Sequence, residues 1–109
     1  MAEKLKLTKP VMINGEEFTE LPYDFEEMTA RDKIDAGKKM KAAQVPISNI
    51  EELDTDYHFF LFAQAVYKAD SSIDINDVMR ISAKDAREAG KLARSFFYFD
   101  SEESSLTII

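Results

Sequence analysis

The chain has 109 residues, is 45% hydrophobic and 32% charged, and carries a formal net charge of −7, values typical of one globular domain. It contains no cysteine and one histidine, which excludes disulfides, thiolate zinc sites, cysteine nucleophiles and multi-histidine metal sites. The negative charge argues against broad binding of nucleic acid or anionic membranes, and no apolar run reaches the ~18 residues of a membrane span.

The dipeptide Asn14-Gly15 is the strongest local signal near the start of the chain. Both residues tolerate the positive φ values of a type I′ turn, and such a turn closes a two-residue β-hairpin. Folding the flanking segments about this turn places Val11 opposite Phe18, so that two apolar side chains share one face. The sequence therefore predicts a β-hairpin over residues 5–23.

The same register makes two further predictions about the strands. It places Lys9 opposite Glu20, as a cross-strand pair of opposite charge. The apolar alternation then changes phase, because Leu21 occupies an odd position whereas Phe18 occupies an even one. This slip predicts a bulge or bend near Leu21-Pro22.

The period of the apolar residues becomes helical after the hairpin. Thr29 followed by Asp32 is typical of a helix start, since a threonine hydroxyl caps free amides and an acid favours the positive end of the helix dipole. We expect a helix over residues 29–42, followed by the break at Val45-Pro46. Its predicted apolar face is thin and consists of Ala30, Ile34, Gly37 and Met40.

The most apolar stretch is Tyr57–Tyr67, within a predicted helix over residues 55–69. Wound as a helix it is apolar on nearly every face, so it is either buried at the centre of the fold or shared with a partner. The side chains expected in the interior are Phe59, Phe62, Ala63 and Val66.

Two more helices are predicted, a short one over residues 74–81 and a longer one over residues 82–99, which Ser82 caps. The longer helix has a stripe of small residues that allows close approach of another helix: Ala86, Ala89, Gly90 and Ala93. Residues 100–109 form an acidic tail with apolar residues at its end. The expected fold class is α+β, with residues 1–99 as one domain in which an N-terminal β-hairpin is followed by a small bundle of three to four helices.

The chain offers few groups for catalysis or metal binding. Asp54 could orient His58 as a general base, but no nucleophile or ligand cluster accompanies the pair, and a capping or surface histidine is the simpler interpretation. Asp70, Asp74 and Asp77 lack the glycine and the final glutamate of a calcium loop. We therefore expect a binding protein with no enzymatic activity and no cofactor.

Acidic and basic blocks alternate along the chain. Residues 11–28 contain acids and no base, whereas residues 29–46 and 82–99 are net basic. Blocks of this kind usually complement one another across the surface of a small fold. The alternative is a docking surface for a charged partner.

Three stretches of the sequence have the order found in a known family. Leu7–Leu21 contains a proline, an apolar residue and the turn Asn14-Gly15 before a leucine, and Met28–Asp32 follows as a helix start. Ile81–Asp85 then precedes an alanine-rich helix that ends in Phe96-Phe97. In this order the stretches resemble the tail assembly chaperones of contractile-tailed, Mu-like and P2-like phages and prophages.

The resemblance implies a binding role. Such chaperones are made in the cytoplasm of the bacterial host, often together with a frameshifted longer form of the same chain. They bind the tape measure protein and keep it soluble before tail tube subunits polymerise around it, and they are absent from the mature virion. The alternative function is an acidic DNA mimic or host-factor inhibitor, which needs carboxylates at phosphate-like intervals on one face.

The apolar surplus of the sequence predicts where a partner binds. A chain this short has more apolar surface in Tyr57–Tyr67 than one sheet and two helices readily cover. We therefore expect a homo-oligomer, binding of an apolar client helix, or both. The apolar end of the tail adds a second adhesive element. The candidate partner-binding residues are Tyr57, Phe59, Phe60, Phe62, Tyr67, Leu106, Ile108 and Ile109.

Overall fold

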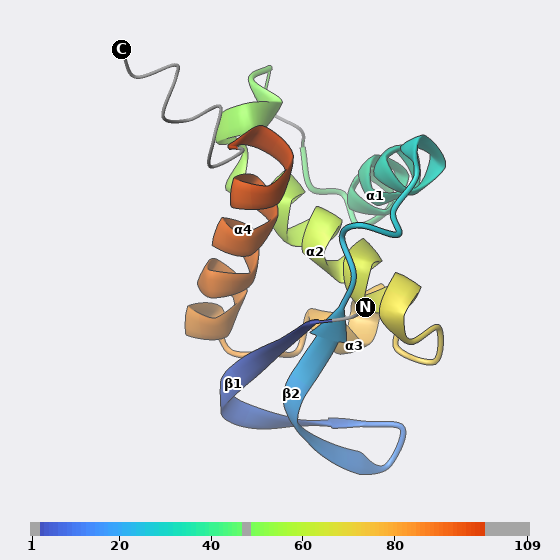
Figure 1. The fold of residues 1–109 in the computed structure, drawn as a ribbon, viewed down its shortest axis with the longest axis vertical. Helices are drawn as coiled ribbons and strands as arrows, with labels where there is room; N and C mark the ends of the chain where they lie inside the picture. The colour runs from blue at the N-terminus through green and yellow to red at the C-terminus, as the bar shows by residue number, and fades with distance from the viewer. Residues whose placement is uncertain (1–2, 47–48, 100–109) are drawn as a thin grey trace.

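A two-stranded antiparallel β-hairpin leads into a group of packed helices in the computed structural model, which describes residues 3–46 and 49–99 (Figure 1). The elements follow in the order β1 (Glu3–Ile13), β2 (Glu16–Tyr23), α1 (Ala30–Ala42), the one-turn 3-10 helix η1 (Glu51–Leu53), α2 (Thr55–Ala69), α3 (Ile75–Val78) and α4 (Ala83–Tyr98). The predicted α+β class, a hairpin followed by three to four helices, is confirmed. The predicted tail lies outside the described residues.

The capping residues place the starts of α1 and α4 as predicted. The Thr29 hydroxyl accepts a hydrogen bond from the Asp32 amide, and the Ser82 hydroxyl accepts one from the Asp85 amide. Each bond satisfies one of the amides that have no partner within the first turn of a helix. Local sequence therefore determines where these two helices begin.

The predicted helix over residues 74–81 is wrong in length, because α3 ends at Val78. The amides of Arg80 and Ile81 donate to carbonyls three residues back, so the chain continues as a tight turn. Ser82 must then be extended, with ψ 155°, to cap α4. A helix that continued through this point would remove the cap.

The Asn14-Gly15 turn is confirmed. Asn14 has φ 53° and Gly15 has φ 80°, and Val11 faces Phe18 as predicted. The Asn14 side-chain amide also donates to the Ser72 carbonyl over 3.0 Å. The turn is thus tied to the loop before α3 as well as to its own strands.

Gly15→Val is expected to lower the free energy of unfolding by about 1–2 kcal/mol, because a β-branched residue resists positive φ. Apart from the two residues next to Gly15 in the chain, nothing lies within 4 Å of the place that a Cβ would take there, so the cost is one of backbone conformation. Urea denaturation followed by circular dichroism measures it. Gly15→Asn is the control with a smaller loss, because asparagine tolerates this region. A midpoint unchanged by the valine would contradict the turn.

The register beyond Val11 differs from the prediction. Lys9 does not face Glu20; Lys6 does, and Lys4 forms the ion pair with Glu20 over 3.3 Å. The irregularity therefore lies in β1 between Lys6 and Val11, and the predicted bulge at Leu21-Pro22 is wrong. The cause lies in another element, because the amides of β1 at this point donate to a side chain of α4, as described below.

The core is built around α2, which contacts α1, α3, α4 and β2 and lies between α1 and α4 in Figure 1. Neighbours on several sides explain why this helix is apolar on nearly every face. Phe62, Ala63 and Val66 are buried as predicted, whereas Phe59 is only half-buried. At the end of the hairpin Tyr23 adds an aromatic contact, with its ring centroid 5.2 Å from that of Phe62.

The predicted apolar face of α1 is rotated with respect to the real one. Asp32, Ala36 and Met40 are buried, whereas Ile34 is 52% exposed and Ala30 is exposed. The periodicity of the apolar residues could not show this, because one of the buried residues is an acid. Its burial depends on polar partners from α2.

Candidate functional site

The polar groups in the interior are used to join elements. Asp32 accepts hydrogen bonds from the Thr29 amide and hydroxyl and from Gln64 Nε2, and it pairs with Lys68 over 3.2 Å. Burial by itself would raise the pKa of Asp32, but these partners outweigh it and lower the pKa to about 2. Lys39 donates to Gln64 Oε1, which completes a bridge between α1 and α2. The hydrogen-bonding groups of this cluster therefore have their partners within the cluster.

His58 is buried, so the expectation of a surface histidine is wrong, whereas its bond to a backbone carbonyl of η1 is a capping contact. It is 1% exposed, and its Nε2 lies 2.9 Å from the Glu51 carbonyl oxygen. Its ring lies against that of Tyr98, with centroids 5.3 Å apart. Burial lowers the pKa of His58, although the bond to Glu51 opposes the shift. Asp54 caps α2 by accepting from the Tyr57 amide, so it supports the helix start.

Asp85 joins α4 to β1. Its carboxylate is 1% exposed and accepts the Thr8 amide over 2.9 and 3.0 Å and the Lys9 amide over 3.4 Å. Burial would raise the pKa of Asp85, but these amides and Ser82 lower it. Where the register shifts, no carbonyl of β2 is placed to accept from these two amides. The carboxylate of Asp85 accepts from them instead. This contact explains the bulge in β1.

A groove lies between α2 and α4. At its α3 end a hollow of about 630 Å³ is lined by Thr55, Asp56, Phe59, Met79, Ile81, Ala83, Ala86 and Arg87. A second hollow of about 320 Å³ is lined by Thr55, His58, Ala86, Arg87, Gly90, Lys91 and Arg94. The two share Thr55, Ala86 and Arg87, so they form one groove, which we call the α2–α4 groove.

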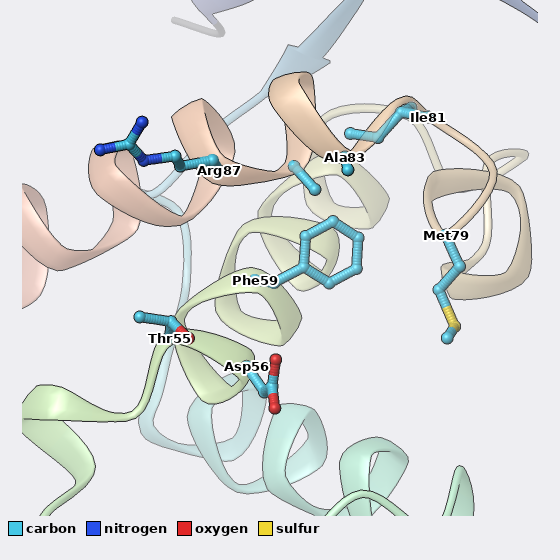
Figure 2. Close-up of a pocket in the computed structure, with 8 residues that line it drawn as sticks. Thr55, Asp56, Phe59, Met79, Ile81, Ala83 and Arg87 are labelled. Atoms are coloured by element: carbon cyan, nitrogen blue, oxygen red, sulfur yellow. The ribbon is translucent and has the colours of Figure 1, made fainter.

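Small and apolar residues form the floor of the α2–α4 groove. Figure 2 shows the ring of Phe59 between α2 and α4, with Ile81 and Met79 toward α3. At Gly90 a Cβ would lie 3.7 Å from the Thr55 carbonyl oxygen, an ordinary contact distance, so the two helices are close here without a clash. The half-buried Phe59 and the 47%-exposed Met79 leave apolar surface open to a ligand.

Charged residues form the margins of the groove. Arg87, Lys91 and Arg94 line it from α4, and Asp56 lines it from α2. Arg94 Nε donates to the Glu52 carbonyl over 3.2 Å, and its guanidinium lies 4.7 Å from the centroid of the Phe99 ring. The groove therefore combines an apolar floor with one basic wall.

The structure separates the predicted partner-binding residues into three groups. Tyr57, Phe60 and Phe62 are buried in the core, so one copy of the chain covers them. Phe59 lines the α2–α4 groove. Tyr67 is 40% exposed and lies under the ammonium group of Lys39, on the side of α1. The remaining predicted residues, Leu106, Ile108 and Ile109, lie outside the described residues.

Most residues of the groove carry no clear signal in the sequence. The stripe that contains Ala86 and Gly90 was visible as a place of close helix approach, and these two residues lie on the floor. A signal that could have found three more residues is the four-and-three spacing of Arg87, Lys91 and Arg94, which places these bases on one side of a helix. Met79 has no such signal, because its place depends on the tight turn after α3.

Over residues 3–46 and 49–99, no group of three or more histidine, aspartate or glutamate side chains is arranged to hold a metal ion. The helices in the same part of the chain are too short or too polar to cross a bilayer. No family model, no curated protein and no solved structure matches the chain.

Proposed function

We propose that this chain is a tail assembly chaperone of a phage or prophage, which binds the tape measure protein and keeps it soluble during tail morphogenesis. In this proposal the protein acts in the cytoplasm of the bacterial host, alone or with a frameshifted longer form, and is absent from the mature virion. It performs no reaction. Its activity is the covering of apolar helix surface on a client until the tail tube replaces it.

The observation that supports the proposal is the α2–α4 groove. Between Ala83 and Arg94 the groove follows α4 for about 16 Å, which is about three helical turns. Its apolar floor, with the open surface of Phe59 and Met79, suits the apolar face of one helix of a client. A net charge of −7 favours the solubility of such a complex.

The alternative function, an acidic DNA mimic or host-factor inhibitor, has less support. A mimic needs an uninterrupted array of carboxylates. On α4 three bases stand on one side, at positions 87, 91 and 94, and on α1 Lys38 and Lys41 are exposed. These bases interrupt the acidic surface, so we favour the chaperone.

Ala83→Trp is expected to reduce capture of the tape measure protein at least tenfold when the two proteins are co-expressed and one is purified by an affinity tag. Ala83 is exposed and lines the groove, so an indole at this position fills part of the space for a client helix. Immunoblotting of the eluate and the soluble fraction of the tape measure protein measure the effect.

Ala30→Trp is the matched control. Ala30 is the first residue of α1 and Ala83 is the first residue of α4, both are exposed, and each follows a capping hydroxyl residue. The cost to helix stability is therefore similar, but Ala30 lines none of the hollows of the groove. No capture by the unmodified chain would contradict the proposed function. Equal capture by both variants would exclude the groove as the binding site.

A further inference from the structure

The basic wall of the α2–α4 groove is regular. Arg87, Lys91 and Arg94 are spaced by four and three residues along α4, so their side chains form one row parallel to the groove. The row lies in a chain whose net charge is −7. A row of bases beside an apolar floor is a feature that solubility alone does not require.

Two of these bases are available to a ligand. Arg87 is exposed, and its guanidinium has no hydrogen bond or ion pair with any residue in the described ranges 3–46 and 49–99. Figure 2 shows its side chain at the edge of the hollow, directed away from Phe59. Lys91 is exposed, and within the described part of the chain it pairs with Glu88 of its own helix alone, over 3.5 Å. Exposed pairs of this kind contribute little, so a ligand can replace this one.

The other wall differs in charge. From α2 the groove is lined by Thr55, Asp56, His58 and Phe59. Asp56 is the acid among them, and burial lowers the pKa of His58, which favours its neutral form. A helix in the groove therefore meets bases along one of its flanks and an acid along the other. A ligand helix with acidic residues on the flank that faces α4 is compatible with this arrangement. A ligand helix with basic residues on that flank is repelled.

We propose that the α2–α4 groove selects an amphipathic helix of about three turns whose apolar face is flanked, on the side of α4, by acidic residues at four-and-three spacing. The identity of this helix as a segment of the tape measure protein rests on the proposed function, whereas the selection by charge does not. The acidic flank lies against Arg87, Lys91 and Arg94, and the apolar face covers Phe59.

Two synthetic helical peptides test the selection. Each has about 15 residues, leucine and alanine on one face, and the same lactam bridge on the opposite face to keep its helicity constant. One carries three glutamates at four-and-three spacing beside the apolar face, and the other carries lysines at these positions. Fluorescence anisotropy with the full chain is expected to show about tenfold tighter binding of the glutamate peptide in 50 mM salt and a smaller ratio in 500 mM salt.

The double variant Arg87→Glu/Lys91→Glu is expected to reverse the preference, so that the lysine peptide binds more tightly. Arg94 stays unchanged, because it also contacts Glu52 and Phe99. Lys38→Glu/Lys41→Glu is the control with the same change in net charge, at exposed positions of α1, and it is expected to keep the original preference.

Three results would overturn the inference. The first is equal affinity of the chain for both peptides. The second is an unchanged preference for the glutamate peptide in the Arg87→Glu/Lys91→Glu variant. The third is self-association of the chain that this variant abolishes, because the groove would then bind a second copy. The proposed function is tested separately. If the chain captures the tape measure protein but binds both peptides equally, only this inference is overturned. If the chain prefers the glutamate peptide but does not capture the tape measure protein, only the proposed client is overturned.

Discussion

Phe62→Ala is expected to lower the free energy of unfolding by about 3–5 kcal/mol, the usual cost of truncating a buried phenylalanine. Phe62 is fully buried in α2, and its ring centroid lies 5.2 Å from that of Tyr23 and 6.3 Å from that of Phe25. The substitution therefore leaves a cavity between the central helix and the end of the hairpin. Small domains have a total stability of about 5–15 kcal/mol, so urea denaturation measures the loss easily.

Phe96→Ala is the matched control for this prediction. Its ring also contacts Phe25, with centroids 5.1 Å apart, but its side chain is 45% exposed. Truncation at this position removes less buried surface, and we expect a loss of about 1 kcal/mol or less. Equal losses at positions 62 and 96 would show that the core is not centred on α2.

Asp85→Asn is expected to lower the free energy of unfolding by about 2–3 kcal/mol at neutral pH, a value typical of hydrogen bonds to a charged group. One oxygen of the carboxylate becomes an amide nitrogen, which cannot accept from the amides of Thr8 or Lys9. A buried donor then has no partner, and β1 loses its attachment to α4. Denaturation of the two proteins in parallel measures the difference.

The pH dependence of the same variant gives an independent check. The pKa of Asp85 is lower in the folded chain than in the unfolded chain, because the amides of Thr8 and Lys9 outweigh the effect of burial. The stabilisation is therefore complete above about pH 4, the unfolded value, and is lost as the pH falls through the folded value. The difference in stability between Asp85→Asn and the unmodified chain should thus become smaller below pH 4.

Asp56→Asn is the control for both measurements. Asp56 is in the first turn of α2, as Asp85 is in the first turn of α4, but it is exposed. A helix-dipole effect alone is worth about 0.3–1 kcal/mol at such a position. If the two asparagine variants lost the same stability, the contact between Asp85 and β1 would make no net contribution.

The sequence by itself determined the features that depend on a few neighbouring residues. The turn at Asn14-Gly15 follows from two residues that tolerate positive φ, and the starts of α1 and α4 follow from the hydroxyls of Thr29 and Ser82. The composition of α2 left two alternatives, a helix buried at the centre of the fold or one shared with a partner, and the structure shows the first. For the turn and the two caps the physical cause acts within about one turn of chain, so the pattern is visible without the fold.

Tertiary structure decided the features that depend on partners from distant parts of the chain. The bulge in β1 exists because Asp85, more than seventy positions later, accepts the amides of Thr8 and Lys9. The buried face of α1 is rotated toward Asp32 because Gln64 and Lys68 stabilise its charge.

The α2–α4 groove belongs to the same class. Arg87, Lys91 and Arg94 are visible in the sequence as a row, but only the packing of α4 on α2 places this row beside the floor of Phe59. A buried acid is stable only when a second element supplies its hydrogen-bond partners, and a groove forms only where two elements pack together. A local sequence pattern does not specify which elements meet.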